Sequence, residues 1–441
     1  MSKLIIPIIE GINNERLYEW IDAGYLTNFK RIYNQGSIKD LKCTDIPYEP
    51  AGLVSAFSGE KESEHGIMAY FKVHNKMYTP ELWHSDDIKH KMFWNTDAFK
   101  DHKIGVVNVF GTDPVYEVNG CLLSYAMKKS LHYCYPEDLI YTLSEKGIFC
   151  IQDTAMIYHP SIPMKVFYRD VKRIEQLRHK TMQELLKTDL DIIIVNYTLI
   201  ERVSHFCTSE LYNDDIPLDN KIVFQAYKEC DKLLGDVVDY VEETNSNMLF
   251  FSEVGFGPLK SFVSVNKYLA EKDLLKYDDS KKGPIWNKTV AFESVQGSNG
   301  ININRKSIYN EGIVEDSEYE SILNDVISVV KSMENPYTHE PMFSEVIPGR
   351  EIYKGSQIPD IILKPFDWHY LFYGDDFWGD FISRNCQTGW HRSTSVWGGI
   401  GPDISNNVRE GSYSLIDILP SVYRLMKKEI PGNLSGKSFL D

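Results

Sequence analysis

The chain has 441 residues, with 63 acidic against 47 basic side chains and a formal net charge of −16 at pH 7. A field of this sign repels polyanions, and no Lys/Arg-rich stripe reverses it locally, so we expect no nucleic acid partner. No apolar segment approaches the roughly 20 residues that span a bilayer, and the N-terminal apolar run is too short for a secretory signal. We therefore expect a cytoplasmic protein without a membrane partner.

Short apolar runs alternate along the chain with segments of helical periodicity. The runs are continuous, which is typical of strands buried on both faces of a parallel sheet. They are Leu4–Ile9, Ile104–Val109, Ile148–Ile151, Asp191–Val195 and Met248–Phe251. The predicted helices are Glu15–Ala23, Thr27–Asn34, Asp170–Leu186 and Val223–Glu242. This order predicts an α/β fold with a doubly wound, mostly parallel central sheet flanked by helices.

The pattern becomes irregular between Gly255 and Trp390, where Gly, Asn, Asp and aromatic residues cluster. Such a stretch favours an inserted cap that elaborates a pocket over the sheet. A continuous apolar run returns at Thr394–Ile400. We predict an α/β core, a cap and a return to the core, over residues 1–256, 257–387 and 388–441.

Three of the apolar runs end on a carboxylate or reach one within a turn. Glu10 follows the first run and Glu253 follows the last, while Asp191–Val195 leads on to Glu201 and His205. Ligands of doubly wound sheets bind beyond the carboxyl ends of the strands. We therefore expect these side chains to converge on one site, although a single acid in such a place is usually a solvated strand end.

Several short motifs follow one another along essentially the whole chain. They are Glu10-Gly11, Gly24–Gly36, Ser58-Gly59, Asn108–Gly120, Glu201–His205, Ser252–Pro258 and Gly389–Arg392. In this order they resemble the alkaline-phosphatase superfamily, in its type I phosphodiesterase/nucleotide pyrophosphatase and predicted phosphohydrolase/phosphomutase branch. The resemblance implies in-line displacement at phosphorus or sulfur by a Thr or Ser nucleophile held against two divalent cations, usually zinc or manganese.

The resemblance also implies the metal ligands, residue by residue. The first ion would be held by Glu201, His205 and His391, with Glu in place of the family's Asp. Three N/O ligands with an open position suit a catalytic metal. The second ion would be held by Glu10 and Glu253, which again replace Asp.

The nucleophile position departs most from the family. The family's spacing lands on Glu49, so the alcohol is absent there, and Val254 stands where the family has a metal-binding His. Ser55, Ser58 and Thr44 are the hydroxyl side chains nearby. Each is a further candidate nucleophile.

These replacements have two explanations, a decayed site or a rebuilt one. Decay would leave small and apolar residues, whereas the inventory, with Glu49 included, keeps four carboxylates and two imidazoles. Four carboxylates without a cation would repel one another. Four Glu and two His are also the ligands of di-iron and di-manganese carboxylate proteins on a different fold. We expect two divalent metal ions, zinc or manganese, with iron as an alternative.

The leading hypothesis is a divergent metal-dependent hydrolase of phosphoric or related esters, in which metal-bound water replaces the missing alcohol and Glu49 is a ligand or general base. The alternatives are a non-hydrolytic di-iron or di-manganese enzyme and a non-catalytic family member. A small anionic substrate would meet Asn108, Arg202 and Arg392, although turn capping and ion pairing also explain such residues. The identity of the substrate and the oligomeric state stay open.

Overall fold

The computed structural model describes residues 3–125, 130–149, 161–278, 283–366, 369–372, 382–383 and 386–441. The chain forms two compact units. Unit 1 consists of Met1–Lys61, His84–Pro258 and His391–Asp441, and unit 2 consists of Glu62–Trp83 and Leu259–Trp390. The division into residues 1–256, 257–387 and 388–441 stays a prediction. Unit 2 also contains residues 62–83, which the sequence analysis placed in the core.

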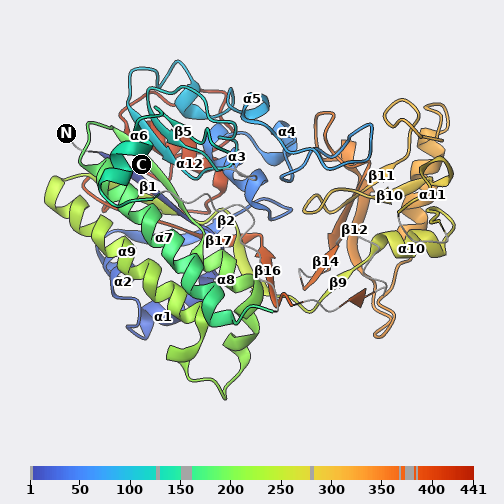
Figure 1. Cartoon of the computed structure of the whole chain (residues 1–441), viewed down its shortest axis with the longest axis horizontal. Helices are drawn as coiled ribbons and strands as arrows, with labels where there is room; N and C mark the ends of the chain where they lie inside the picture. Colours follow the sequence, from blue (N-terminus) through green and yellow to red (C-terminus); the bar gives the residue numbers. More distant parts are fainter. Residues whose placement is uncertain are drawn as a thin grey trace. The chain divides into compact units, whose positions relative to one another are not determined.

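Unit 1 is built on an eight-stranded sheet (Figure 1). In spatial order its strands are β2 (Ser37–Lys42), β17 (Thr394–Ile400), β7 (Asn247–Phe251), β1 (Leu4–Ile9), β6 (Ile192–Tyr197), β3 (Ile104–Val107), β4 (Gly120–Leu123) and β5 (Cys134–Tyr135). The five strands from β7 to β4 run parallel to one another, while β17 and β5 are antiparallel to their neighbours. The predicted doubly wound, mostly parallel sheet is therefore confirmed.

Helices cover both faces of this sheet. Successive side chains of a strand point to opposite faces, so two neighbouring residues of one strand identify the helices on each side. On β7, Phe250 contacts Phe29 of α2, whereas Phe251 contacts Phe57 of α3. The first face carries α1 (Asn14–Asp22), α2 (Thr27–Gln35), α7 (Met164–Leu186), α8 (Leu199–Cys207) and α9 (Ile222–Thr244), of which α7, α8 and α9 lie side by side in Figure 1. The second face carries α3 (Glu49–Ser58), against which α12 (Ile418–Leu425) packs. In the described part of the chain, no helix has both the length and the apolar character needed to cross a membrane.

The predicted strand at Ile148–Ile151 is wrong at its first two residues. Ile148 and Phe149 follow α6 (Leu139–Glu145), and the Ile148 N–H donates to the Leu143 carbonyl, which closes the end of that helix. An apolar residue just past a helix end commonly packs back on its last turn. Residues 150 and 151 lie outside the described residues. On the side away from β6, β3 pairs with β4, a strand that the sequence analysis did not predict.

Unit 2 has two small sheets and a core of its own. The first sheet is antiparallel, in the order β10 (Ala291–Glu293), β11 (Gly300–Ile303), β13 (Ile361–Pro365) and β12 (Phe343–Pro348). The second has the order β14 (Tyr370–Phe372), β9 (Ser261–Val263) and β15 (Ile382–Ser383). Helix α11 (Tyr319–Lys331) packs on β12, and α10 (Val265–Glu271) packs on β10. The core includes Leu323, Val326, Ile301 and Leu363.

The remaining short elements connect these parts. They are α4 (Glu62–His65), α5 (Ser85–Ile88), β8 (Gly255–Pro258), β16 (Gly389–Arg392) and the 3-10 turns Phe93–Asn95, Thr208–Tyr212, Leu218–Asn220, Trp286–Lys288, Gly349–Glu351 and Leu415–Asp417. Of these, β16 carries His391, one of the predicted metal ligands.

Candidate metal centre

The carboxyl ends of three adjacent parallel strands bring acidic residues to one edge of the sheet. Strand β1 leads directly to Glu10, and β7 is followed by Ser252 and Glu253. Strand β6, on the other side of β1, leads into α8. The side chains of Glu10 and Glu253 are 1% and 0% exposed, so neither is the solvated strand end that a lone acid would suggest.

Helix α8 presents Glu201 and His205 four residues apart, so both side chains lie on the same face of the helix. Its first turn is held by a buried acid from α7. One Glu175 oxygen accepts the Leu199 backbone N–H at 2.7 Å, and the other pairs with Arg178 at 2.6 Å. The start of α8 is therefore fixed against α7, and Glu201 is fixed with it.

Two glycines allow the backbone to approach the acidic side chains. Gly11 has φ of +79°, and a Cβ there would lie 2.9 Å from the Cα of Glu201. A Cβ at Gly52 of α3 would lie 3.0 Å from the Cβ of Glu253. A side chain at either position would push these segments apart, so both glycines are part of how the acids are packed.

Glu49 and His391 complete the group from two other segments. Glu49 is the first residue of α3, and its side chain is 4% exposed. In β16, the Nδ1 of His391 lies 3.2 Å from the Pro47 carbonyl oxygen. A carbonyl can only accept, so Nδ1 carries the proton. The Nε2 lone pair then faces the carboxylates, 3.4 Å from Glu49 Oε1 and 3.6 Å from Glu201 Oε1.

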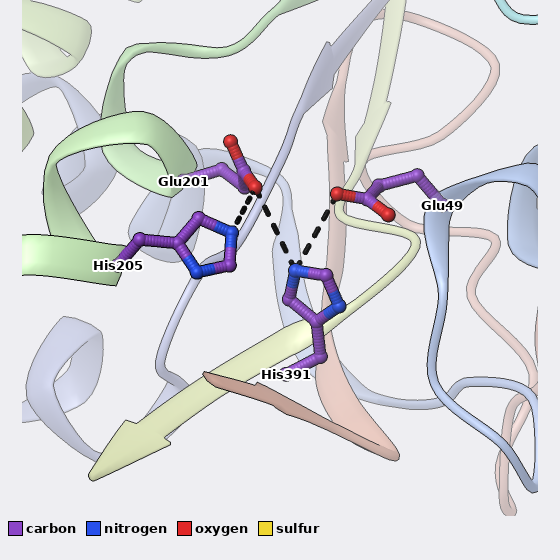
Figure 2. Close-up of side chains that lie close together, drawn as sticks. All are labelled: Glu49, Glu201, His205 and His391. Atoms are coloured by element: carbon purple, nitrogen blue, oxygen red, sulfur yellow. Dashed lines mark hydrogen bonds and ion pairs between the residues drawn. The ribbon is translucent and has the colours of Figure 1, made fainter. Parts of the chain in front are cut away.

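Four of the six predicted ligands form one compact group. Figure 2 shows Glu49, Glu201, His205 and His391 directed at one another, with His205 Nε2 2.5 Å from Glu201 Oε1. One ligand atom from each lies within 4.8 Å of the others. Donor atoms bonded at about 2.0–2.2 Å to one ion lie within about 4.4 Å of one another. The group is therefore close to the size of a single coordination shell.

The other two predicted ligands, Glu10 and Glu253, are not members of this four-residue group. Glu10 Oε1 accepts a hydrogen bond from the Asn196 amide at 2.5 Å. Both oxygens of Glu253 are buried without a hydrogen-bond partner, and so is Oε2 of Glu49 and of Glu201. Burying a carboxylate without partners is costly, and a coordinated cation removes that cost. The residues present therefore fit bound metal.

The charges of these acids are coupled. Burial raises the pKa of Glu49 to about 8, with the charge of Glu201 adding to the shift. Burial also raises the pKa of Glu10 and of Glu253 well above the ordinary range, and neighbouring carboxylates add to both shifts. Burial acts in the same direction on Glu201, but nearby His205, Arg202 and His391 together outweigh it and hold the pKa of Glu201 well below its usual value. Without a cation, the site thus favours one ionised carboxylate among protonated ones.

Two of the predicted substrate residues contact Glu201 or Asn196. Arg202, on α8, has its guanidinium 3.4 Å from Glu201 Oε2 and 3.4 Å from the Tyr125 hydroxyl. Asn108 follows β3 with φ of +59° and donates to the Asn196 carbonyl at 3.4 Å. Their roles toward a substrate stay predictions.

Arg392 makes different contacts. Its guanidinium donates to the backbone carbonyls of His391 at 2.9 Å and of Pro258 at 2.5 Å. These bonds fix the backbone beside His391, and a role in substrate binding stays a prediction.

The sequence analysis missed two residues of the site. Asn196 donates to Glu10, and its signal was a polar residue near the end of an otherwise apolar strand. Phe256 packs its ring 5.0 Å from that of His205 and 5.5 Å from that of His391. Phe256 stands in the motif Ser252–Pro258, but its packing against the two imidazoles depends on contacts with residues far along the chain.

Known structures with similar folds include three phosphorus-processing enzymes or their variants. An inactive threonine-to-alanine variant of murine ectonucleotide pyrophosphatase / phosphodiesterase 5 in complex with AMP aligns with a TM-score of 0.55 and 11% identity, over 98% of this chain and 97% of that one. Phosphonoacetate hydrolase from Sinorhizobium meliloti 1021 in complex with phosphonoacetate gives 0.61 and 12%, over 96% and 95%. Wild-type alkaline phosphatase PafA gives 0.59 and 16%, over 99% and 98%. At these identities the likeness establishes the fold.

The comparison by family model is more specific. A comparison with curated proteins gave no match. The model described as type I phosphodiesterase / nucleotide pyrophosphatase matches residues 4–394. This range contains all six predicted metal ligands, from Glu10 to His391. The resemblance inferred from the motifs is therefore confirmed. The chain belongs to the type I phosphodiesterase / nucleotide pyrophosphatase family, and it is a phosphodiesterase-like enzyme.

Proposed function

We propose that the protein is a metal-dependent hydrolase of phosphoric or related esters that works without an alcohol nucleophile, with Glu49 at that position. The observation that carries this proposal is the buried group of Glu49, Glu201, His205 and His391, whose ligand atoms lie within 4.8 Å of one another. Carboxylate oxygens and imidazole nitrogens are the donors that zinc and manganese accept in proteins.

The residues divide the work of holding the ions. Glu201, His205 and His391 would hold one ion, and Glu10 and Glu253 would hold the second. When bound, the two cations supply a nucleophilic water and stabilise the charge that develops on the ester. The bond from His391 Nδ1 to the Pro47 carbonyl keeps Nε2 aimed at the site, as second-shell partners of metal-binding histidines do.

Glu49 would act as a ligand or as the general base. Its Oε2 is buried and has no hydrogen-bond partner, so it is free to take a proton from water. Burial raises the pKa of this carboxyl to about 8 in the metal-free chain, and a base works best when its pKa lies near the working pH.

The substrate would be a small anion. Arg202, whose side chain is 17% exposed beside Glu201, would meet the anionic group, with Arg392 and Asn108 as further contacts. The small molecules named with two structural neighbours, AMP and phosphonoacetate, are also anions.

A second candidate function is a non-hydrolytic di-iron or di-manganese centre that activates oxygen. It is favoured by Glu253, because both of its buried oxygens lack partners and a Glu carboxylate can bridge two ions. The ligand set is rich in hard oxygen donors, which suit iron and manganese.

Metal content separates the two functions. Protein purified without chelator should contain zinc or manganese and hydrolyse at least one member of a panel of phosphate mono- and diesters. Iron together with oxygen consumption would support the second function. Protein without metal and without activity on the panel would contradict both.

Glu49→Gln tests the residue at the centre of the proposal. The substitution should lower both metal content and ester hydrolysis by roughly tenfold or more, since loss of a partner of a metal site costs about 10–100-fold. Glu293→Gln is the matched control, because Glu293 is a buried acid of unit 2 whose Oε2 accepts the Val265 backbone N–H at 3.1 Å. Unchanged metal content and activity in Glu49→Gln would make Glu49 an ordinary buried acid.

A further inference from the structure

Unit 2 contains a cavity that shares no residue with the candidate metal centre. Its volume is about 560 Å³, and small-molecule pockets measure roughly 300–1,000 Å³. Three cationic side chains line it, Lys76, Arg305 and Arg350, against one carboxylate, Asp360. This excess of positive charge is unusual in a chain with a net charge of −16.

The one carboxylate of the lining is already engaged by neutral donors. Asp360 is 7% exposed. Its Oδ2 accepts the Ile303 backbone N–H at 2.7 Å, and its Oδ1 accepts the Tyr319 hydroxyl at 2.8 Å. The nearest nitrogen of Arg305 is 3.6 Å from Oδ1, which is beyond hydrogen-bond distance. Asp360 therefore fixes Tyr319 and leaves donors of Arg305 unused.

Arg305 is held in place by an aromatic ring. Its Cζ lies 4.5 Å from the centroid of the Tyr319 ring, and 25% of its side chain is exposed. The Nε of Arg305 is buried without a hydrogen-bond partner. A guanidinium positioned in this way presents a planar fork of donors that matches an oxyanion.

The other two cations differ in how they are held. Arg350 lies with its Cζ 5.8 Å from the same Tyr319 ring, and Glu320 pairs with its guanidinium at 2.6 Å. Lys76 is exposed. Glu320 and Asp360 offset part of the arginine charge, and Lys76 adds a third cation to the lining. The unused donors of Arg305 and the ammonium of Lys76 are the groups that a phosphoryl group would meet.

We propose that this cavity is a second binding site, for a small phosphomonoester, with the phosphoryl oxygens bound by Arg305 and Lys76 and the organic part against Tyr319 and Ile308. The site is independent of the proposed hydrolase function, since every lining residue belongs to unit 2. A phosphoryl group carries close to two negative charges at neutral pH and has three acceptor oxygens, which suits an arginine fork together with an ammonium.

Calorimetric titration of the full-length protein, as purified, with phenylphosphonate tests this site. The probe keeps a phosphoryl-like dianion next to an aromatic ring and has no ester bond to hydrolyse. Wild-type protein should show a saturable component that inorganic phosphate displaces. Arg305→Met and Lys76→Met should each weaken that component by about tenfold, the scale of a lost charge-assisted hydrogen bond. Glu49→Gln should leave it unchanged.

Lys306→Met is the matched control. Lys306 follows Arg305 directly, is exposed, pairs with Glu315 and does not line the cavity. Its substitution removes the same charge and should leave the affinity unchanged. Lys76→Met keeps the test valid if Arg305→Met loses the Tyr319 contact and unfolds, because Lys76 is exposed. Absence of the saturable component in wild type, an unchanged affinity in Lys76→Met, or an equal loss of affinity in Lys306→Met would overturn the proposal.

Discussion

Glu253 is buried without a hydrogen-bond partner for either carboxylate oxygen. Its substitution should therefore change the stability of the metal-free protein and the metal content in opposite directions. Burial raises its pKa well above the ordinary range, so folding the metal-free chain at neutral pH requires this group to take up a proton. Glu253→Gln removes that requirement. We expect a higher Tm for the metal-free protein and, because a ligand is lost, a lower metal content.

Glu293 provides the comparison for this substitution. It is also buried, but its Oε2 accepts the Val265 backbone N–H at 3.1 Å. Glu293→Gln should lower the Tm and leave the metal content unchanged. Calorimetry of chelated samples and elemental analysis of untreated ones measure both effects. If Glu253→Gln kept its full metal content, Glu253 would not be a ligand.

Helix α8 depends on an acid that belongs to another element. Glu175 of α7 receives the first N–H of α8 and pairs with buried Arg178. Glu175→Ala removes one partner of a buried ion pair, which costs about 3–5 kcal/mol. We expect that loss in the free energy of unfolding, measured by urea denaturation, together with weaker metal binding, because Glu201 and His205 lose the anchor of their helix.

Glu184 lies on the same helix and pairs with Lys146 and Lys187 near the surface. Ion pairs of this kind contribute little to stability. Glu184→Ala should therefore leave both the unfolding curve and the metal content nearly unchanged. If Glu175→Ala and Glu184→Ala changed the unfolding curve and the metal content equally, the contact between Glu175 and Leu199 would have no specific role in holding α8.

Elements differ in how far the sequence predicts them. Continuous apolar runs predicted the strands β1, β6 and β7, because strands whose residues are all buried need such runs. The convergence of the acids at their ends followed from the geometry of parallel sheets. Strand β4 begins with a glycine and has four residues, too few for a periodic signal. Phe256 and the cavity in unit 2 were not predicted, because each depends on contacts between segments distant in sequence.

At the scale of the whole molecule, the acid cluster should make stability depend on pH in a way that metal reverses. The pKa of Glu49 is about 8 in the folded chain against 4.5 as the ordinary value, and the pKa of Glu10 and of Glu253 is raised as well. Between these pH values the unfolded chain releases protons that the folded chain keeps. Stability is therefore greatest at the acid end of the window and falls as pH rises, by about 1.4 kcal/mol for each unit of pKa difference.

Urea denaturation between pH 5 and about 8 measures this slope. Chelated protein should lose stability with rising pH, and protein with zinc or manganese should gain it, because ligands bind metal only when deprotonated. Glu201, whose pKa is lowered, acts below this window and does not alter the sign. If the free energy of unfolding had the same dependence on pH with and without metal, these acids would not be metal ligands.

Strand β17 lies between β2 and β7, although it follows both by more than a hundred residues. During synthesis from the N-terminus, these two strands emerge early and keep unpaired edges until residue 400 has left the ribosome. Such edges are exposed to mispairing, and long-range closure is slow. His391 emerges only a few residues before β17, so the last imidazole and the closing strand arrive together. A cation bound there would therefore stabilise the completed sheet and would not nucleate its folding.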